Sequence, residues 1–391
     1  MRWIPYGIII VLFINCSHHS PKSADFSDKW SVIMADAVMN RYDSLCSYNH
    51  PDRINWQYDI AMLGQAIDKL GYLDARYSKY NEDFIDYFIT DDGKIRTYNI
   101  EEYNLDNVNP AKGLITQYKR KGDTKYLIAV NTIISQLQHQ PETHSGGYWH
   151  KLKYPWQMWL DGIYMASPFL AQYAKEFNKK EWFDTVSKQI ILIYNKTLDP
   201  SSGLLYHAWD ESKSQKWCNP ETGQSTQFWG RAMGWYMMAL VDVLEYLPSD
   251  FQTRDSLLLI LNNTSEALLR YRDHETGLWY QVLDQQGREG NYLEASCSSM
   301  FTYAFAKAAR KDYLPEKFDE IAKNSFRAIT ENFIVTGEDG LPVMTHICGS
   351  AGLGGTPYRD GSYEYYIHEL QVVNDPKGVG PFILAAIELN N

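Results

Sequence analysis

Two short stretches combine the residue types that a site for an acidic sugar needs. The first, residues 154–162 (YPWQMWLDG), places the carboxylate of Asp161 among large apolar rings near a helix start. The second, residues 228–235 (FWGRAMGW), sets Arg231 and Trp235 one helical turn apart, on the same face of a helix. A guanidinium grips carboxylates in a two-pronged way, and rings stack on sugar faces. Together these groups indicate proton transfer on an acidic sugar.

Two carboxylates are the candidates for acid–base chemistry. Asp161 is the leading one, because apolar surroundings favour the protonated form that a proton donor needs at neutral pH. Asp106 is the second and stands in a run of Asn and Asp before a predicted helix. Each has a structural alternative. Asp161 would serve as a helix cap or a salt-bridge partner, and Asp106 as a turn or cap residue.

Other polar and aromatic residues are candidates for holding a substrate. His150 and His207 occupy the same position in two copies of a weak repeat, so both should face one centre. A structural role is equally open for either histidine, and no third ligand stands at a spacing that suits a metal. For Trp229 and Trp235 the alternative to stacking on sugar is packing between helices. A glycine-rich loop at 349–358 follows His346 and matches no phosphate-binding motif.

The elements that must position these residues come from an internal repeat. Gly146, Gly203, Gly277 and Gly340 open related segments at intervals of roughly 60 residues, each interval with room for two helices. This repeat predicts stacked helical hairpins, either closed into an all-α (α/α)6 barrel or left as an open superhelix. The long glycine-marked loops should gather at one end. Apolar periodicity predicts helices at 28–46, 57–71, 75–89, 107–121, 125–138, 155–177, 180–196, 228–247, 252–271, 293–311, 315–333 and 378–390.

Composition narrows the class of protein. The 391 residues are 45% hydrophobic and carry a net charge of −11, which argues against a nucleic-acid partner. No linker interrupts residues 28–391, so we expect one domain there. Four separated cysteines lack a CxxC pair and are best read as isolated buried thiols, although disulfides stay open: Cys46, Cys218, Cys297 and Cys348.

The N-terminus has the features of an export signal. One positive charge and a short apolar run precede Cys16, and the run is too short to span a bilayer. We expect residues 1–16 to be a signal peptide whose Cys16 carries lipid, with 17–27 as a polar tether. The protein would then lie in the periplasm or at the outer membrane. Asn15 departs from the usual small residue before such a cysteine, so plain secretion is the alternative.

Several motifs together resemble the unsaturated rhamnogalacturonyl hydrolases, glycoside hydrolase family 105, and the related unsaturated glucuronyl hydrolases of family 88. They are WH at 149–150, QMWLDGIYM at 157–165, YHAWD at 206–210, FWGRAMGW at 228–235 and AGLGG at 351–355. The resemblance implies an (α/α)6 barrel without metal or cofactor. It assigns the acid/base role to Asp161 and the second aspartate to Asp106. Substrate contacts fall on His150, His207, Trp229, Arg231 and Trp235, with Tyr58 and His346 added as expected contacts.

The resemblance also implies a reaction. A terminal 4,5-unsaturated uronic acid, left by a pectin lyase, is protonated at C4 and hydrated at C5, and its neighbouring sugar is released. Two alternatives remain at this point. One is another enzyme on the same barrel, either a glucuronyl hydrolase or an ordinary uronic-acid glycosidase with Asp106 and Asp161 as paired carboxylates. The other is a protein without catalysis, either a surface glycan-binding lipoprotein or a repeat scaffold for interactions.

Overall fold

The computed structural model describes residues 27–48 and 54–390, where twelve long helices form two concentric layers. The inner helices are α2 (Tyr58–Asp68), α4 (Ala111–Lys121), α6 (Leu160–Glu176), α8 (Gly230–Tyr246), α10 (Ala295–Arg310) and α13 (Pro376–Leu389). The outer helices are α1 (Ser27–Arg41), α3 (Ala75–Phe88), α5 (Thr124–Gln138), α7 (Glu181–Thr197), α9 (Arg254–Arg270) and α11 (Lys317–Phe333).

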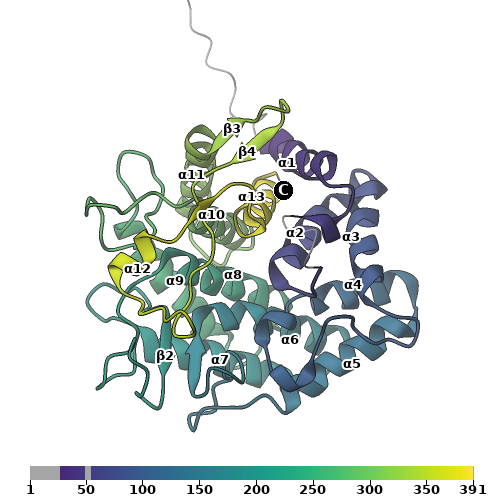
Figure 1. Ribbon diagram of the computed structural model, residues 1–391, viewed down its shortest axis with the longest axis horizontal. Helices are drawn as coiled ribbons and strands as arrows, with labels where there is room; N and C mark the ends of the chain where they lie inside the picture. Colours follow the sequence, from purple (N-terminus) through teal and green to yellow (C-terminus); the bar gives the residue numbers. More distant parts are fainter. Residues whose placement is uncertain (1–26, 49–53, 391) are drawn as a thin grey trace, which may run out of the picture.

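The helices follow one another around a ring in chain order (Figure 1). Colour runs in that view from purple α1 through blue and teal to green α11, and yellow α13 returns beside α1. Helix α13 packs against α10 on one side and α2 on the other, which closes the ring. The predicted (α/α)6 barrel is therefore confirmed, and an open superhelix is excluded.

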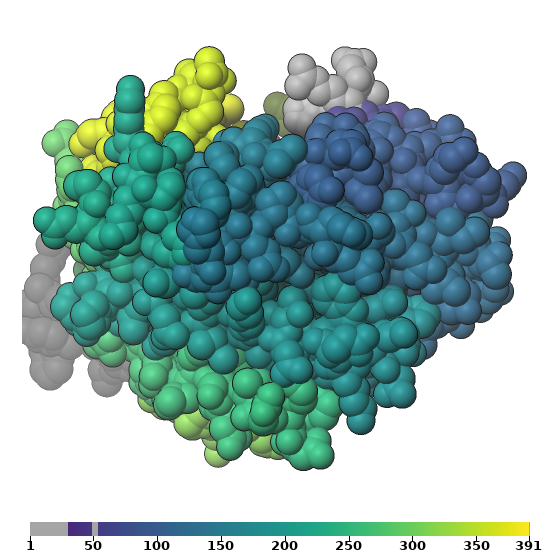
Figure 2. Space-filling view, turned by 90° about the horizontal axis from the view of Figure 1, so that it is seen from below, coloured from purple at the N-terminus to yellow at the C-terminus, as the bar shows by residue number. Residues whose placement is uncertain are grey.

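Burial explains which helices lie inside. In α8 and α10 nearly every residue is buried, because these helices touch an outer layer on one side and the barrel interior on the other. Outer helices such as α3 and α11 bury a single apolar face and expose the rest. The middle of the chain forms an unbroken outer surface when seen from below (Figure 2).

A tight turn follows five of the outer helices and carries a glycine with positive φ, between 74° and 80°. Glycine adopts this left-handed conformation without the steric penalty that other residues meet. The five positions are Gly93, Gly146, Gly203, Gly277 and Gly340. Four of them are the repeat marks predicted from the sequence, so the repeat corresponds to the helical hairpins.

All six inner helices run in the same direction, because each is reached by a long loop from an outer helix. Their first turns therefore lie at the end of the ring where the long loops gather. Tyr58 opens α2, Asp161 is the second residue of α6, and Arg231 is the second residue of α8. Asp106 lies in the 3-10 helix η4 (Leu105–Asn107), just before α4. The repeat thus delivers distant residues to one end of the barrel.

Short irregular elements complete the fold in the described residues. Three two-stranded antiparallel pairs lie in the loops, and a short helix lies near the C-terminus. The other 3-10 helices are η1 (Leu45–Ser47), η2 (Lys69–Tyr72) and η3 (Ile100–Glu102). The remaining elements are β1 (Gln157–Trp159), β2 (Ala208–Asp210), β3 (Ile334–Thr336), β4 (Pro342–Met344), β5 (Ile347–Cys348), β6 (Gln371–Val372) and α12 (Tyr363–Ile367).

Three predicted helix boundaries are wrong by four or five residues. The helix expected at 28–46 ends at Arg41, and the helix expected at 107–121 begins at Ala111. The third lies at the candidate site. The expected helix at 155–177 begins only at Leu160, because β1 pairs with β2, Gln157 opposite Asp210 and Trp159 opposite Ala208. This pairing joins two of the repeated loops, and it holds the chain extended up to the residue before α6. Asp161 therefore lies at the junction between β1 and α6, which the pairing of β1 with β2 holds in place.

The remaining expectations concern cysteines and the N-terminus. Cys46, Cys218, Cys297 and Cys348 are free thiols, and all but the half-buried Cys46 are buried. The predicted signal, Cys16 and nearly all of the tether lie outside the described residues. No helix among the described residues is long and apolar enough to cross a membrane.

Candidate active site

Asp161 lies in the first turn of α6, with 15% of its side chain exposed. Its Oδ2 atom is 3.1 Å from Nε2 of His207, and Nδ1 of the same ring is 2.7 Å from the hydroxyl of Tyr366. The ring of His207 thus bridges Asp161 and Tyr366, one ring nitrogen bonding each of them. Tyr366 thereby fixes the orientation of the ring that touches Asp161.

Asp106 has a different set of partners. Its carboxylate forms an ion pair with Lys151, and Oδ1 is 3.6 Å from Nε2 of His150. Burial raises the pKa of Asp106, but the charge of Lys151 and its hydrogen bond to the carboxylate oppose burial, and the pKa lies below its ordinary value. Asp106 is therefore an anion across the physiological pH range.

His150 contacts both of the segments that carry the two aspartates. A Cβ on Gly162 would lie 2.9 Å from Nδ1 of His150 and 3.2 Å from Cδ1 of Leu105, so the start of α6 packs directly against both residues. The backbone N–H of Leu105 in turn donates to the carbonyl of His150, at 3.1 Å. Residues adjacent to Asp106 and Asp161 are thus in contact. Gly162 is required here because a larger residue would push the His150 ring away.

The two histidines flank one tryptophan. The ring of His150 stacks on Trp159 with centroids 4.6 Å apart, and His207 meets the same ring edge-on at 5.4 Å. Burial lowers the pKa of His150 to about 4, so this ring is neutral at physiological pH. The predicted convergence of the two repeat-related histidines is therefore seen in the structure. Among the described residues, no group of three His, Cys, Asp or Glu side chains could hold a metal ion.

Arg231 is a buried cation with spare hydrogen-bonding capacity. It is 1% exposed, and its guanidinium carbon lies 5.0 Å from the ring centroid of Trp229. Its Nη2 atom reaches only the carbonyl of Gly349, at 3.4 Å, while Nη1 has no hydrogen-bond partner. A buried, unpaired guanidinium nitrogen is costly unless a ligand satisfies it. Arg231 is thus arranged to receive an anion.

Aromatic residues form the layer beneath these charges. Trp235 stacks on Tyr164 with centroids 5.0 Å apart, and the ring of Tyr58 meets Trp235 edge-on at 5.8 Å. Burial raises the pKa of the Tyr58 hydroxyl. The charges of Asp106 and Asp161 raise this pKa further, whereas the charge of Arg231 lowers it. The hydroxyl of Tyr58 is therefore near enough to these three charged groups for each to shift its pKa.

One predicted contact lies apart from this cluster. His346 is exposed; its Nδ1 is 2.8 Å from the Thr345 hydroxyl, and its ring is 5.6 Å from that of Phe333. No hydrogen bond or ring contact described for His346 joins it to the two aspartates or to Arg231. The glycine-rich loop that follows it instead folds back over β1, where Arg359 donates to the hydroxyl of Tyr154 at 2.9 Å.

Sequence reasoning missed three residues that shape the site. Lys151 neutralises Asp106, and Tyr366 orients His207. Gln281 accepts from Nε1 of Trp229 at 3.1 Å and donates to the carbonyl of Tyr366 at 3.0 Å. Gln281 follows Gly277 by the same number of residues that separates His150 and His207 from their repeat glycines. The repeat register therefore contained a signal for Gln281.

Comparisons with known proteins agree with this fold. Residues 30–391 match the family model described as Glycosyl Hydrolase Family 88. A solved family 105 glycoside hydrolase of C. acetobutylicum ATCC 824 is 44% identical, with a TM-score of 0.88 over 92% of this chain and 99% of that chain. The unsaturated rhamnogalacturonyl hydrolase YesR of Bacillus subtilis is 26% identical over 265 residues, 66% of this chain and 71% of that protein.

A further relative is the protein Atu3128 of Agrobacterium fabrum, which is 39% identical over 233 residues, 57% of this chain and 97% of that protein. The helical barrel and these matches define the protein as a glycoside hydrolase. The chain belongs to glycosyl hydrolase family 88 together with its family 105 relatives.

Proposed function

We propose that this hydrolase removes the terminal 4,5-unsaturated uronic acid from pectin oligosaccharides, of the rhamnogalacturonan type, that a lyase has generated. The observation that carries the proposal is the unpaired, buried Nη1 of Arg231 at the same barrel end as the Asp161–His207 pair. The first group fits a uronate carboxylate, and the second fits a proton donor beside it. The name of the YesR relative describes the same kind of substrate.

In this reaction Asp161 gives its proton to C4 of the double bond. The resulting cation at C5 is stabilised by the ring oxygen, and water attacks C5 while Asp161 takes a proton from it. The hemiketal then opens, and the exposed C1 releases the neighbouring sugar as an alcohol. One water is consumed, and Asp161 ends in its starting form. The anionic Asp106 and the neutral His150 would hold sugar hydroxyls beside the reacting ring.

A cavity beside the site offers room for the rest of the substrate. It measures about 560 Å³ and lies between the glycine-rich loop, which Arg359 follows, and the chain around the start of β1, including Tyr154 and Gln157. The ring of Tyr154 stacks on Trp159 with centroids 5.0 Å apart, so the cavity continues from the ring that both histidines touch. We place the neighbouring sugar in this cavity.

The test is a spectrophotometric assay on defined oligosaccharides. Lyase-digested pectin and lyase-digested glucuronan are incubated with the protein, and the ultraviolet absorbance of the double bond is followed. The proposal expects that signal to disappear, with the pectin product turned over faster, and expects saturated oligosaccharides to stay intact. Cleavage of the saturated oligosaccharides would identify an ordinary glycosidase. Binding without turnover of any substrate would identify a glycan-binding protein.

Removal of Lys151 should change the pH dependence of this activity. In Lys151→Met the charge that most lowers the pKa of Asp106 is gone, so burial dominates and that pKa rises. The anionic form, and the stability it contributes, is then lost at a higher pH on acidification. We expect the acid limb of the kcat/KM profile to move to higher pH. Lys179→Met, an exposed lysine, is the matched control, and an unmoved acid limb in a folded Lys151 variant would refute the role of Asp106.

We further propose that Cys16 carries a lipid that anchors the exported protein to the periplasmic face of a membrane. The support is the charge, apolar run and cysteine at the N-terminus. Cys16→Ala should move the protein from the membrane fraction to the soluble periplasmic fraction without loss of hydrolase activity. A membrane-bound alanine variant, or a soluble wild-type protein, would contradict the anchor.

A further inference from the structure

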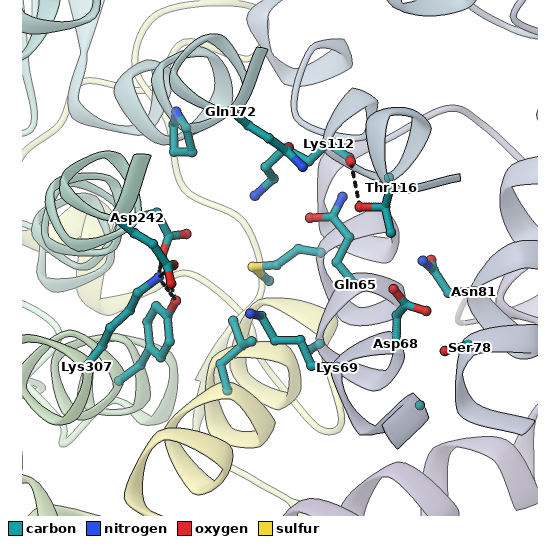
Figure 3. Close-up of a pocket in the computed structure, with 18 of the residues that line it drawn as sticks. Gln65, Asp68, Lys69, Ser78, Asn81, Lys112, Thr116, Gln172, Asp242 and Lys307 are labelled. Atoms are coloured by element: carbon teal, nitrogen blue, oxygen red, sulfur yellow. Dashed lines mark hydrogen bonds and ion pairs between the residues drawn. The ribbon is translucent and has the colours of Figure 1, made fainter. Parts of the chain in front are cut away.

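A second cavity, of about 600 Å³, lies inside the barrel at the end opposite Asp161. Most of its wall comes from the later turns of the inner helices, as Figure 3 shows for labelled residues of α2, α6, α8 and α10. Lys112 reaches the cavity from the first turn of α4, and Asn81 reaches it from outer helix α3. Tyr164 lies at the boundary, since it lines this cavity and also stacks on Trp235 of the candidate active site. Neither Asp161 nor Arg231 lines the cavity, so it is separate from the candidate active site.

The carboxylates in the wall are already neutralised. Lys307 contacts Asp242 and Glu245, each at 2.7 Å. On the other side of the cavity, Arg120 contacts Asp68 at 2.6 Å. Glu245 also contacts Lys311 at 3.3 Å, so each of the three wall carboxylates has its own cation. The wall nevertheless contains two more lysines, so its net charge is positive.

Those two lysines, Lys69 and Lys112, have no ion-pair partner among the described residues. The ammonium of Lys112 lies 3.3 Å from the hydroxyl of Tyr164 and 4.5 Å from the centroid of its ring. Burial lowers the pKa of Lys112 to about 8, which leaves the group mostly charged at neutral pH. Lys69 is exposed, and its side chain points into the same space (Figure 3). Lys112 is half-buried, and an ammonium that is partly removed from water without an anion is stabilised by a ligand that supplies one.

Amide groups around the cavity are also unsatisfied. Nδ2 of Asn81, Oε1 of Gln172 and Nε2 of Gln65 are buried and have no hydrogen-bond partner. Asn81 is 1% exposed and Gln172 is 8% exposed, so bulk water does not satisfy them freely. Such groups are costly when they stay unpaired. They supply both donors and an acceptor, which suits a ligand with several hydroxyl groups.

We propose that this cavity is a second binding site, for a small hydroxylated carboxylate, that is, a sugar acid. Its carboxylate would pair with Lys112 and Lys69, and its hydroxyls would bond Asn81, Gln65 and Gln172. The volume lies in the range of small-molecule pockets and accommodates one monosaccharide unit. An inorganic anion would satisfy the lysines and leave the amides unpaired. A neutral sugar would leave the lysines unpaired.

Calorimetric titration of the full-length protein tests this proposal. Sodium glucuronate is the probe, with glucose as the neutral analogue and inorganic phosphate as the simple anion. Arg231→Met serves as the background, because it removes the carboxylate contact of the candidate active site and leaves the second cavity untouched. We expect saturable glucuronate binding in this background, with glucose and phosphate at least about tenfold weaker. Absence of glucuronate binding, or equal binding of the three probes, would overturn the proposal.

Substitutions then assign the binding to the cavity. Lys112→Met added to the background should weaken glucuronate at least about tenfold, whereas Lys112→Arg should retain part of the affinity. Lys69→Met changes an exposed residue, so it tests the site even if the Lys112 variant fails to fold. Lys119→Met, on the exposed face of the same helix, is the matched control and should leave the affinity unchanged. Unchanged affinity in folded Lys112→Met and Lys69→Met variants would place the ligand elsewhere. Hydrolase activity is not the readout, so a failure here leaves the proposed reaction standing.

Discussion

Asp161→Asn should lower kcat on the unsaturated oligosaccharide by about 10²–10⁴-fold, the usual contribution of general acid–base catalysis. Asparagine keeps the shape of aspartate and a hydrogen bond to His207, but it carries no acidic proton for C4. The side chain is 15% exposed and forms no ion pair with Lys or Arg among the described contacts, so the barrel should tolerate the change. The measurement is the loss of double-bond absorbance under saturating substrate, together with the melting temperature.

The matched control is Asp123→Asn in the N-terminal cap of outer helix α5. There the aspartate accepts from the backbone N–H of Lys125, and asparagine caps helices about as well. This variant should keep full activity. A folded Asp161→Asn enzyme with less than about a tenfold loss would contradict the assignment of Asp161 as the acid.

Arg231→Met should weaken recognition of the uronate carboxylate. Loss of one member of a buried, hydrogen-bonded charge pair costs about 2–5 kcal/mol, so kcat/KM should fall by at least about 30-fold. The more specific expectation concerns selectivity. The wild type should prefer the free acid over its methyl ester, which has nearly the same shape without the charge, and the methionine variant should lose that preference.

Two further variants separate charge from geometry. Arg231→Lys keeps a positive charge but lacks the planar fork, so it should recover only part of the preference for the acid. Arg327→Met removes an exposed arginine from outer helix α11 and should change neither rate nor selectivity. If a folded Arg231→Met enzyme still prefers the acid to the ester, the carboxylate is held by another group and our assignment is wrong.

Much of the fold could be predicted from the sequence, because its signals are local. The glycine turns and the apolar periodicity each depend on a few neighbouring residues, and they fixed the twelve long helices and their pairing. The start of α6 was predicted wrongly because it depends on a contact between loops far apart in the chain. The pairing of β1 with β2 holds residues 157–159 extended, and Trp156 just before them has a positive φ of 66°.

In the candidate site, too, residues with local sequence signals could be predicted and residues placed by long-range contacts could not. Asp161, Arg231 and Trp235 belong to motifs whose residue types already indicate chemistry, and Gln281 could have been found from the repeat register. Lys151 and Tyr366 belong to neither a chemically informative motif nor the repeat register. Tyr366 reaches His207 from the short helix α12, 159 positions further along the chain. Contacts of this kind exist only once the ring has closed.

The common direction of the six inner helices has an electrostatic consequence. Each helix carries a partial positive charge at its N-terminus from unpaired backbone N–H groups, and all six of these ends lie at the end of the barrel that holds Asp161. The chain as a whole has a net charge of −11, which would repel a uronate at long range. Converging helix dipoles oppose that repulsion at short range, where salt screens them least. Attraction of an acidic substrate is thus a property of the barrel backbone as well as of Arg231.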